Sequence, residues 1–297
     1  MNVNDNVRCW SECWKATTSA VKKEPDEKKL AESWDKRWEK RPERHEHVSD
    51  EERMHRSTQE TLDFLDESGF QVKGKKVLDI GCGPGVLSIP LARLGAEVTS
   101  FDISPKTLDR IQETATEEHL PVKTIAGSWW TADIDELRLR KNFDLVIASR
   151  TPAINDAESI ERMMSCSKDF CYYSSFLNLG ENRVQADLRR LVAKDTGGND
   201  GMRRHFQAYT MVFPFMYLYF SGYRPLVRIN SPEQREELNR GKAAERAIRM
   251  FGHGSDLDDK TKEMVRNYFN TAPEEDLVHP NPAGCHGMMI WNVQGNL

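Results

Sequence analysis

The sequence predicts an α/β fold in which a mostly parallel β-sheet is flanked by helices. Short apolar runs such as "KVLDI" (76–80) and "FDLVIAS" (143–149) have the composition of strands buried on both faces. Helix-like segments separate most of these runs, and strands that alternate with helices indicate βαβ units. Three glycines follow the first run, in "GCGPG" (81–85), where the chain is expected to turn from a strand into a helix.

The expected elements follow one another from residue 75 onward. Apolar runs predict strands at residues 76–80, 97–102, 122–127, 143–149 and 170–176. Helices are expected between them at residues 86–94, 104–119 and 156–168. Beyond residue 208, the sequence fits a helix that stops at Gly222 and a strand directly after it, and residues 287–293 fit a further strand.

The first 70 residues are strongly charged and are expected to form helices. In "EKKLAESWDKRWEKR", Leu30, Trp34 and Trp38 recur at every fourth position and therefore share one helical face. Such an aromatic stripe most often packs a helix onto the body of a protein. The alternative is that Trp34 and Trp38 line an aromatic pocket.

Helix start signals mark two further segments. Ser49 with Glu52 three residues later predicts a capping box, and the helix that it opens is expected to end near Gly69. Ser231 followed by Pro232 predicts a second helix start, because proline is favoured at the first helical position.

The chain is expected to comprise an N-terminal helical cap (1–70) and a core domain (71–297). Two insertions in the core, at about residues 180–204 and 231–285, are long for a compact α/β domain. Long insertions of this kind are often functional lids, so both are predicted to help enclose a ligand.

Composition limits the classes of function. The 297 residues carry a formal net charge of -5, whereas nucleic-acid-binding proteins usually have a basic footprint, so a nucleic acid partner is not expected. The polar start and the lack of an 18-residue apolar run predict neither a secretory signal nor a membrane span. A cytoplasmic location with reduced thiols is expected.

The six cysteines are scattered and do not form a disulfide pattern. Cys9 and Cys13 have a spacing that a metal site tolerates, but no second tight pair follows them. Packed or unreactive thiols are therefore expected, and no metal site is predicted. The alternative is a thiol site completed by Cys166, Cys171 and the pair Cys285-His286.

The glycine-rich turn argues against a dinucleotide site. Glycines let a ligand lie directly on the backbone at a helix N-terminus. The dinucleotide fingerprint is G-x-G-x-x-G, but residues 81–85 read G-x-G-x-G. Asp79, two residues before the first glycine, would oppose a pyrophosphate and suits a ligand with a cationic group. A nicotinamide-dependent oxidoreductase is therefore disfavoured.

The stretch "VLDIGCGPG" resembles motif I of the class I S-adenosylmethionine (SAM) methyltransferases, and the resemblance extends over about residues 75–178. It implies a Rossmann-like seven-stranded sheet, parallel with one antiparallel strand, and SAM as cofactor with S-adenosylhomocysteine as product. In that family the glycine loop wraps the methionine and ribose portion of SAM. The matching residues here are Gly81, Cys82, Gly83 and Gly85.

The resemblance also implies roles for residues outside the glycine loop. Asp79 would lie near the amino-acid end of the cofactor. Asp102, which ends the second strand, would hold both ribose hydroxyls, and Ile103 would pack on the adenine. The family usually has an acidic residue after the third strand to accept from the adenine amine, but this chain has Ser128 there, followed by Trp129 as a backbone donor or flat wall.

The acceptor side is less clearly marked. In the family, the loop after the fourth strand faces the transferred methyl, and here it reads "SRTPAI" (149–154). It lacks the Asn or Asp and the aromatic residue of amino-methylating relatives, so methylation of a base or a glutamine is disfavoured. Ser149 is a candidate cofactor residue, and the candidate substrate-binding residues are Arg150, His205, Tyr209, Trp34 and Trp38. A lone histidine is more often structural, and no catalytic residue is predicted.

The expected function is methyl transfer from SAM to an oxygen, nitrogen, sulfur or carbon atom of a small-molecule acceptor. The leaving group departs neutral, so the enzyme must mainly align the acceptor and exclude water. A base is needed only for a protonated acceptor. Two alternatives remain open, namely methylation of protein or RNA and a non-catalytic SAM-binding module.

Overall fold

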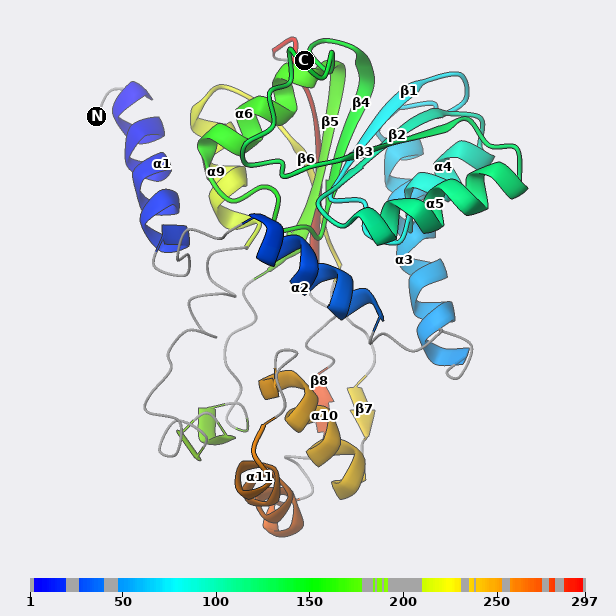
Figure 1. The fold of residues 1–297 in the computed structure, drawn as a ribbon. Helices are drawn as coiled ribbons and strands as arrows, with labels where there is room; N and C mark the ends of the chain where they lie inside the picture. The colour runs from blue at the N-terminus through cyan, green and yellow to red at the C-terminus, as the bar shows by residue number, and fades with distance from the viewer. Residues whose placement is uncertain are drawn as a thin grey trace. The chain divides into compact units, whose positions relative to one another are not determined.

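The computed structural model divides into two compact units, drawn in Figure 1. The first comprises Met1–Ser175, Ala208–Arg228 and Gly287–Leu297, and the second comprises Phe176–Gln207 and Ile229–His286. Both predicted insertions fall in the second unit, and the N-terminal helices belong to the first. The structure describes residues 3–19, 27–39, 48–177, 184, 186–188, 190–191, 210–230, 235–237, 239–252, 257–273, 278–280 and 286–295.

Seven strands form one sheet in the order β3-β2-β1-β4-β5-β9-β6. Strands β1–β5 pair in parallel, and the sheet includes one antiparallel pair, as the family resemblance implies. The apolar runs form these strands because both faces are covered. The strands are β1 (Lys76–Ile80), β2 (Glu97–Asp102), β3 (Val122–Ala126), β4 (Phe143–Ser149), β5 (Ser167–Phe176), β6 (Leu226–Asn230) and β9 (His286–Asn292).

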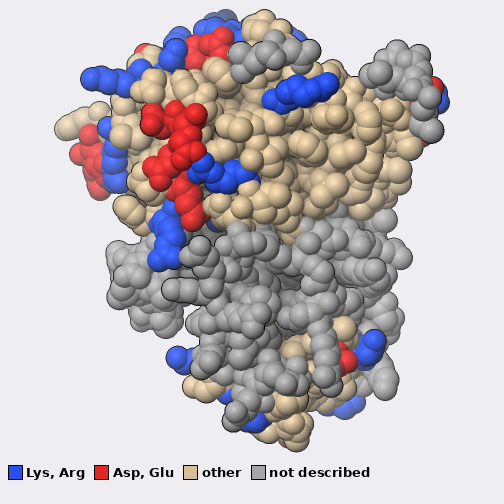
Figure 2. Space-filling model, turned by 180° about the vertical axis from the view of Figure 1, so that it is seen from behind, with Lys and Arg blue, Asp and Glu red and all other residues tan. Residues whose placement is uncertain are grey.

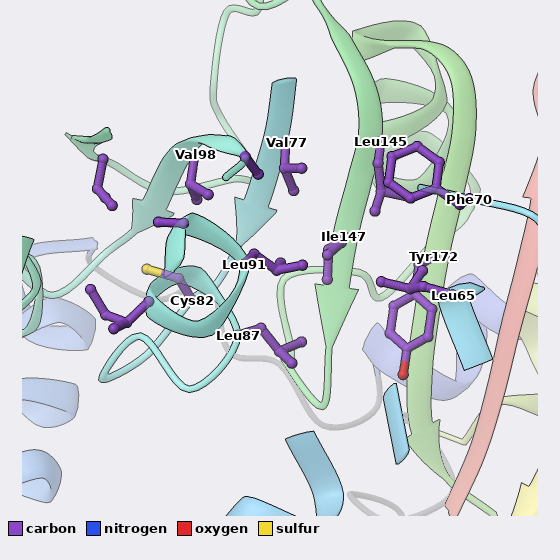
Figure 3. Close-up of a cluster of buried hydrophobic side chains, with 14 of the residues drawn as sticks. Leu65, Phe70, Val77, Cys82, Leu87, Leu91, Val98, Leu145, Ile147 and Tyr172 are labelled. Carbon is purple, nitrogen blue, oxygen red and sulfur yellow. The ribbon is translucent and has the colours of Figure 1, made fainter. Parts of the chain in front are cut away.

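Helices cover both faces of this sheet. Figure 1 shows α3, α4 and α5 on one side and α6 with α9 on the other. On the first side, Figure 3 shows Leu65 of α3, Val77 of β1 and Ile147 of β4 in one buried apolar cluster. The helices are α1 (Val3–Ser19), α2 (Glu27–Glu39), α3 (Val48–Glu67), α4 (Ser88–Arg93), α5 (Pro105–Glu117), α6 (Ala157–Cys166) and α9 (Val212–Phe220).

The second unit contains helices α10 (Arg240–Gly252) and α11 (Asp259–Thr271). Val184 and Leu188 pack with buried residues of both helices, including Ala244 and Phe269. Strand β7 (Arg235–Glu237) pairs antiparallel with β8 (Val278–Pro280).

Two predicted helix starts differ from the structure. Helix α3 begins at Val48, so Ser49 lies inside the helix. Ser231 and Pro232 lie outside the described residues. The helix predicted to follow them is wrong for Arg235–Glu237, because these residues form strand β7 and pair with Val278–Pro280. Cross-strand pairing of this kind overrides local helix propensity.

The described residues show dispersed thiols and mixed surface charge. Cys9 and Cys13 are exposed, whereas Cys82, Cys166 and Cys171 are buried. Within the described ranges there is no group of three or more potential metal ligands, and no helix is long and apolar enough to cross a membrane. On the left flank of the face in Figure 2, basic side chains (Lys and Arg) lie next to acidic ones (Asp and Glu).

Candidate functional site

The glycine loop after β1 needs glycine for both conformation and space. Gly81, Gly83 and Gly85 have positive φ angles of 63°, 52° and 78°, a region that other residues rarely adopt. A Cβ atom at Gly81 would lie 2.0 Å from Oγ1 of Thr151. The loop is fixed to the end of β2, because the Gly81 N–H donates to the Phe101 carbonyl at 2.7 Å.

Asp102, the last residue of β2, faces this loop. Its Oδ2 accepts from the Gly83 N–H at 2.9 Å, and its Oδ1 accepts from the Ser104 N–H at 2.9 Å. Burial raises the pKa of Asp102, and the backbone hydrogen bonds oppose that rise. These backbone bonds fix the carboxylate, and its oxygens retain further acceptor capacity.

These residues border a cavity with about 600 Å³ of empty space, which includes space open to solvent. It lies where the parallel strands end, the usual ligand position in open α/β sheets. Its walls come from α2 and from the residues that follow β1, β2, β3 and β4: Leu30, Trp34, Trp38, Gly81, Gly83, Phe101, Asp102, Ile103, Gly127, Ser128, Trp129, Trp130, Arg150, Thr151, Pro152 and Ala153.

The structure brings most of the sequence-predicted site residues to this cavity. Those that line it are Trp34, Trp38, Gly81, Gly83, Asp102, Ile103, Ser128, Trp129 and Arg150. Those that do not line it are Asp79, Cys82, Gly85 and Ser149. His205 and Tyr209 lie outside the described residues.

Asp79 points into the protein instead of the cavity. Its side chain is buried, and Oδ2 accepts from the Ser88 hydroxyl at 2.7 Å. The Ser100 hydroxyl donates in turn to Ser88 Oγ at 2.8 Å. Burial raises the pKa of Asp79 to about 6 despite the bond from Ser88. In this structure, Asp79 is therefore placed to affect the loop through α4 and not by direct contact with the cavity.

The other three residues that miss the cavity also have packing roles. Cys82 belongs to the buried apolar cluster. A Cβ atom at Gly85 would lie 3.0 Å from Ile111, so this glycine allows close helix packing. The Ser149 hydroxyl lies 2.9 Å from that of Ser174 on β5.

Ser128 and Trp129 form the wall after β3. Ser128 is buried, and among the described residues its Oγ has no hydrogen-bond partner. A buried hydroxyl without a partner is costly, so a polar ligand edge at this wall would satisfy it. The Trp129 indole N–H donates to the Ser159 carbonyl at 3.1 Å, and its ring meets Phe101 edge to face at 5.3 Å. Trp129 is thus a fixed wall.

Helix α2 lies over the glycine loop. A Cβ atom at Gly83 would be 3.1 Å from the Trp38 ring, and the Trp34 and Trp38 rings stack at 6.4 Å. The two tryptophans are partly buried and line the cavity. The aromatic stripe is thus a cavity wall, the alternative that the sequence left open.

Two hydrogen bonds fix α2 to the loops beneath it. Asp35 accepts from the Ser104 hydroxyl at 2.5 Å, and Glu27 accepts from the Thr131 hydroxyl at 2.6 Å. Because Ser104 also donates its N–H to Asp102, it connects the helix to that carboxylate.

Sequence reasoning missed part of the cavity wall. It did not assign site roles to Phe101, Gly127, Trp130, Thr151, Pro152 or Ala153. Trp130 and the residues after Arg150 adjoin predicted positions, so their place at the ends of parallel strands was an available signal. No local signal identifies Asp35, because its partner Ser104 is 69 residues away.

Comparison with known proteins agrees with the fold and the loop. Residues 77–169 match the family model described as "Methyltransferase domain". Residues 77–169 are thus similar to the methyltransferase domains that this model describes.

Relatives of this methyltransferase domain include ubiquinone biosynthesis O-methyltransferases. The chain is 34% identical over 116 residues to the one from Proteus mirabilis and 32% identical over 120 residues to the one from Shewanella pealeana. These matches cover 39% and 40% of this chain. The chain spans 45% of the length of each relative.

The methyltransferase fold extends beyond the matched residues. A candidate sarcosine dimethylglycine methyltransferase from Galdieria sulphuraria superposes with a TM-score of 0.51 and 13% identity. The superposition covers 80% of this chain and 85% of that protein. At this identity the similarity supports the fold alone.

Proposed function

We propose that this protein transfers a methyl group from SAM to a nucleophilic atom of a small-molecule acceptor. The observation that carries the proposal is the cavity at the strand ends of the domain, bordered by the glycine loop and the fixed Asp102 carboxylate. Neither a catalytic base nor a macromolecular substrate is needed to account for this arrangement.

The cavity residues fit SAM by chemical type. Asp102 retains acceptor capacity for two ribose hydroxyls, and such charge-assisted bonds contribute about 1.5–3 kcal/mol each. Ile103 offers an apolar surface for the adenine, and the unpartnered Ser128 hydroxyl suits its polar edge. The pairing of individual residues with parts of the cofactor belongs to the proposal.

SAM supplies a methyl group on a sulfonium and leaves as a neutral thioether. The protein's part is to hold the acceptor in line and to exclude water. Trp34 and Trp38 cover the glycine loop and provide apolar walls for both tasks. Among the described residues of the cavity wall, Asp102 and Arg150 carry the ionisable side chains, and Asp102 is engaged by backbone N–H groups. No general base is therefore assigned.

A small acceptor is favoured over a protein or an RNA. Helix α2 lies across the cavity and is fixed at Ser104 and Thr131, which restricts access by a large substrate. The curated relatives are named for O-methylation in ubiquinone biosynthesis, which supports a small acceptor and oxygen as the first atom to test. A net charge of -5 gives an RNA substrate no general electrostatic attraction.

Cofactor binding can be tested by calorimetry with the full-length protein. Asp102→Ala is expected to weaken SAM binding by about tenfold or more, equivalent to ~1.4 kcal/mol, because the ribose loses its acceptor. Asp144→Ala is the control, since Asp144 accepts from the Lys76 N–H at the opposite end of β1. Equal SAM affinity in wild type and Asp102→Ala would refute the ribose assignment, and lack of binding to wild type would refute the function.

A further inference from the structure

The cavity has an aromatic wall beyond the residues proposed to hold the cofactor. Trp34 and Trp38 come from α2, and Trp130 comes from the segment after β3. The Trp130 indole N–H donates to the Ala153 carbonyl at 3.1 Å, which fixes this ring to the segment after β4. Large rings held in place favour a flat ligand, because they supply contact area with little loss of side-chain freedom.

Arg150 provides the positive charge of the same cavity. It is exposed, and its φ angle of 50° places it in the left-handed region, which is sparsely populated by residues other than glycine. The conformation is held by the Arg150 N–H, which donates to the Ser174 carbonyl at 2.8 Å. Unfavourable backbone conformations that the surrounding structure maintains cluster at functional sites.

The Arg150 guanidinium is available to a ligand. Within the described part of the chain, no carboxylate or carbonyl accepts a hydrogen bond from it. The described groups that act on it electrostatically are Tyr172 of β5 and Glu60 of α3. Arg150 directly follows β4 and therefore lies on the β5 side of the cavity. Asp102 ends β2, which lies on the other side of β1 in the sheet.

The two features together define a ligand class. Aromatic rings alone would also attract a cationic ligand, but a guanidinium in the same cavity would repel it. A planar guanidinium pairs with a carboxylate through two parallel hydrogen bonds. A flat ring with a carboxylate matches both the rings and Arg150.

We infer that the methyl acceptor is an aromatic carboxylic acid, with its ring against the tryptophan wall and its carboxylate on Arg150. This inference rests on the proposed function, because it names the acceptor class of the same site. It assigns Arg150 to the acceptor and not to the carboxylate of SAM.

The test uses three ligands that share a phenol ring and differ in charge: 4-hydroxybenzoate, phenol and tyramine. Each is titrated by calorimetry into the full-length protein saturated with S-adenosylhomocysteine. The anionic ligand is expected to bind at least about tenfold more tightly than phenol, because it gains charge-assisted hydrogen bonds, and tyramine is expected to bind most weakly.

Arg150→Gln should remove the preference for 4-hydroxybenzoate over phenol and leave the affinity for S-adenosylhomocysteine unchanged. Arg138→Gln is the matched control, because Arg138 is also exposed with a positive φ angle of 55° and does not line this cavity. This control should keep the full preference.

Three results would overturn the inference. The wild-type protein could bind none of the three ligands or bind phenol or tyramine as tightly as the acid. Arg150→Gln could keep the preference. If Arg150→Gln kept the preference and also lost affinity for S-adenosylhomocysteine, Arg150 would be assigned to the cofactor. Failure of wild type to bind S-adenosylhomocysteine is a separate result that refutes the proposed function itself.

Discussion

Helices α1 and α2 look alike in sequence and differ in role. Each is charged and carries two tryptophans four residues apart, Trp10 with Trp14 and Trp34 with Trp38. In α1, Trp14 is 1% exposed and stacks on Phe213 of α9 at 6.4 Å. In α2, both tryptophans are partly buried and face the cavity.

The partners of each pair account for the difference. Trp10 and Trp14 both meet the apolar helix α9, where Trp14 becomes part of the protein interior and the partly buried Trp10 ring lies 6.5 Å from that of Phe220. Trp38 meets the glycine loop, where the lack of a side chain at Gly83 lets the ring approach the backbone. An aromatic pair thus acts as packing or as a ligand wall according to the surface opposite it.

The largest expected effect is on stability, from Trp14→Ala. Removing a fully buried tryptophan costs about 3–5 kcal/mol, so the melting temperature should fall by many degrees. Thermal melts followed by circular dichroism measure this change. If the variant melts like wild type, α1 is not part of the folded core.

Trp38→Ala should have the opposite profile, with little change in melting temperature and a turnover lower by roughly 10- to 100-fold. The reason is that an open cavity admits water and holds the acceptor loosely. The assay is formation of S-adenosylhomocysteine, with the acceptor identified by the binding test above. Full turnover in this variant would show that α2 does not enclose the reaction.

Asp35→Asn is expected to have a smaller effect that is confined to the attachment of α2. The charge-assisted bond from Ser104 weakens to a neutral one, so SAM should dissociate about 3- to 10-fold faster. Stopped-flow measurement of SAM release gives this rate. An unchanged rate would mean that α2 does not limit release.

The smallest effect is expected from Cys13→Ser on α1. Cys13 is exposed, and surface substitutions of this kind usually change stability by less than about 0.5 kcal/mol. Neither the melting temperature nor SAM affinity should change. A large loss of stability would place this face of α1 against another part of the protein.

The sequence predicted the features that are encoded locally. The apolar runs identified five parallel strands, because composition and spacing carry that information, and the family resemblance of the glycine loop indicated much of the cavity wall. It did not distinguish α1 from α2, since Phe213 and Gly83 are remote from the tryptophans that they contact. Strand β7 was missed for the same reason, because its partner β8 is distant in the chain.

Ser104 combines several contacts in one small residue. Its N–H holds Asp102, its hydroxyl holds Asp35, and the same hydroxyl caps helix α5 through Thr107. Mutations at this residue and at Asp35 should therefore be non-additive, since each removes the same bond. The position is thereby constrained beyond what its size suggests: among larger residues, threonine alone would keep a hydroxyl on Cβ, whereas alanine would remove both the helix cap and the bond to α2.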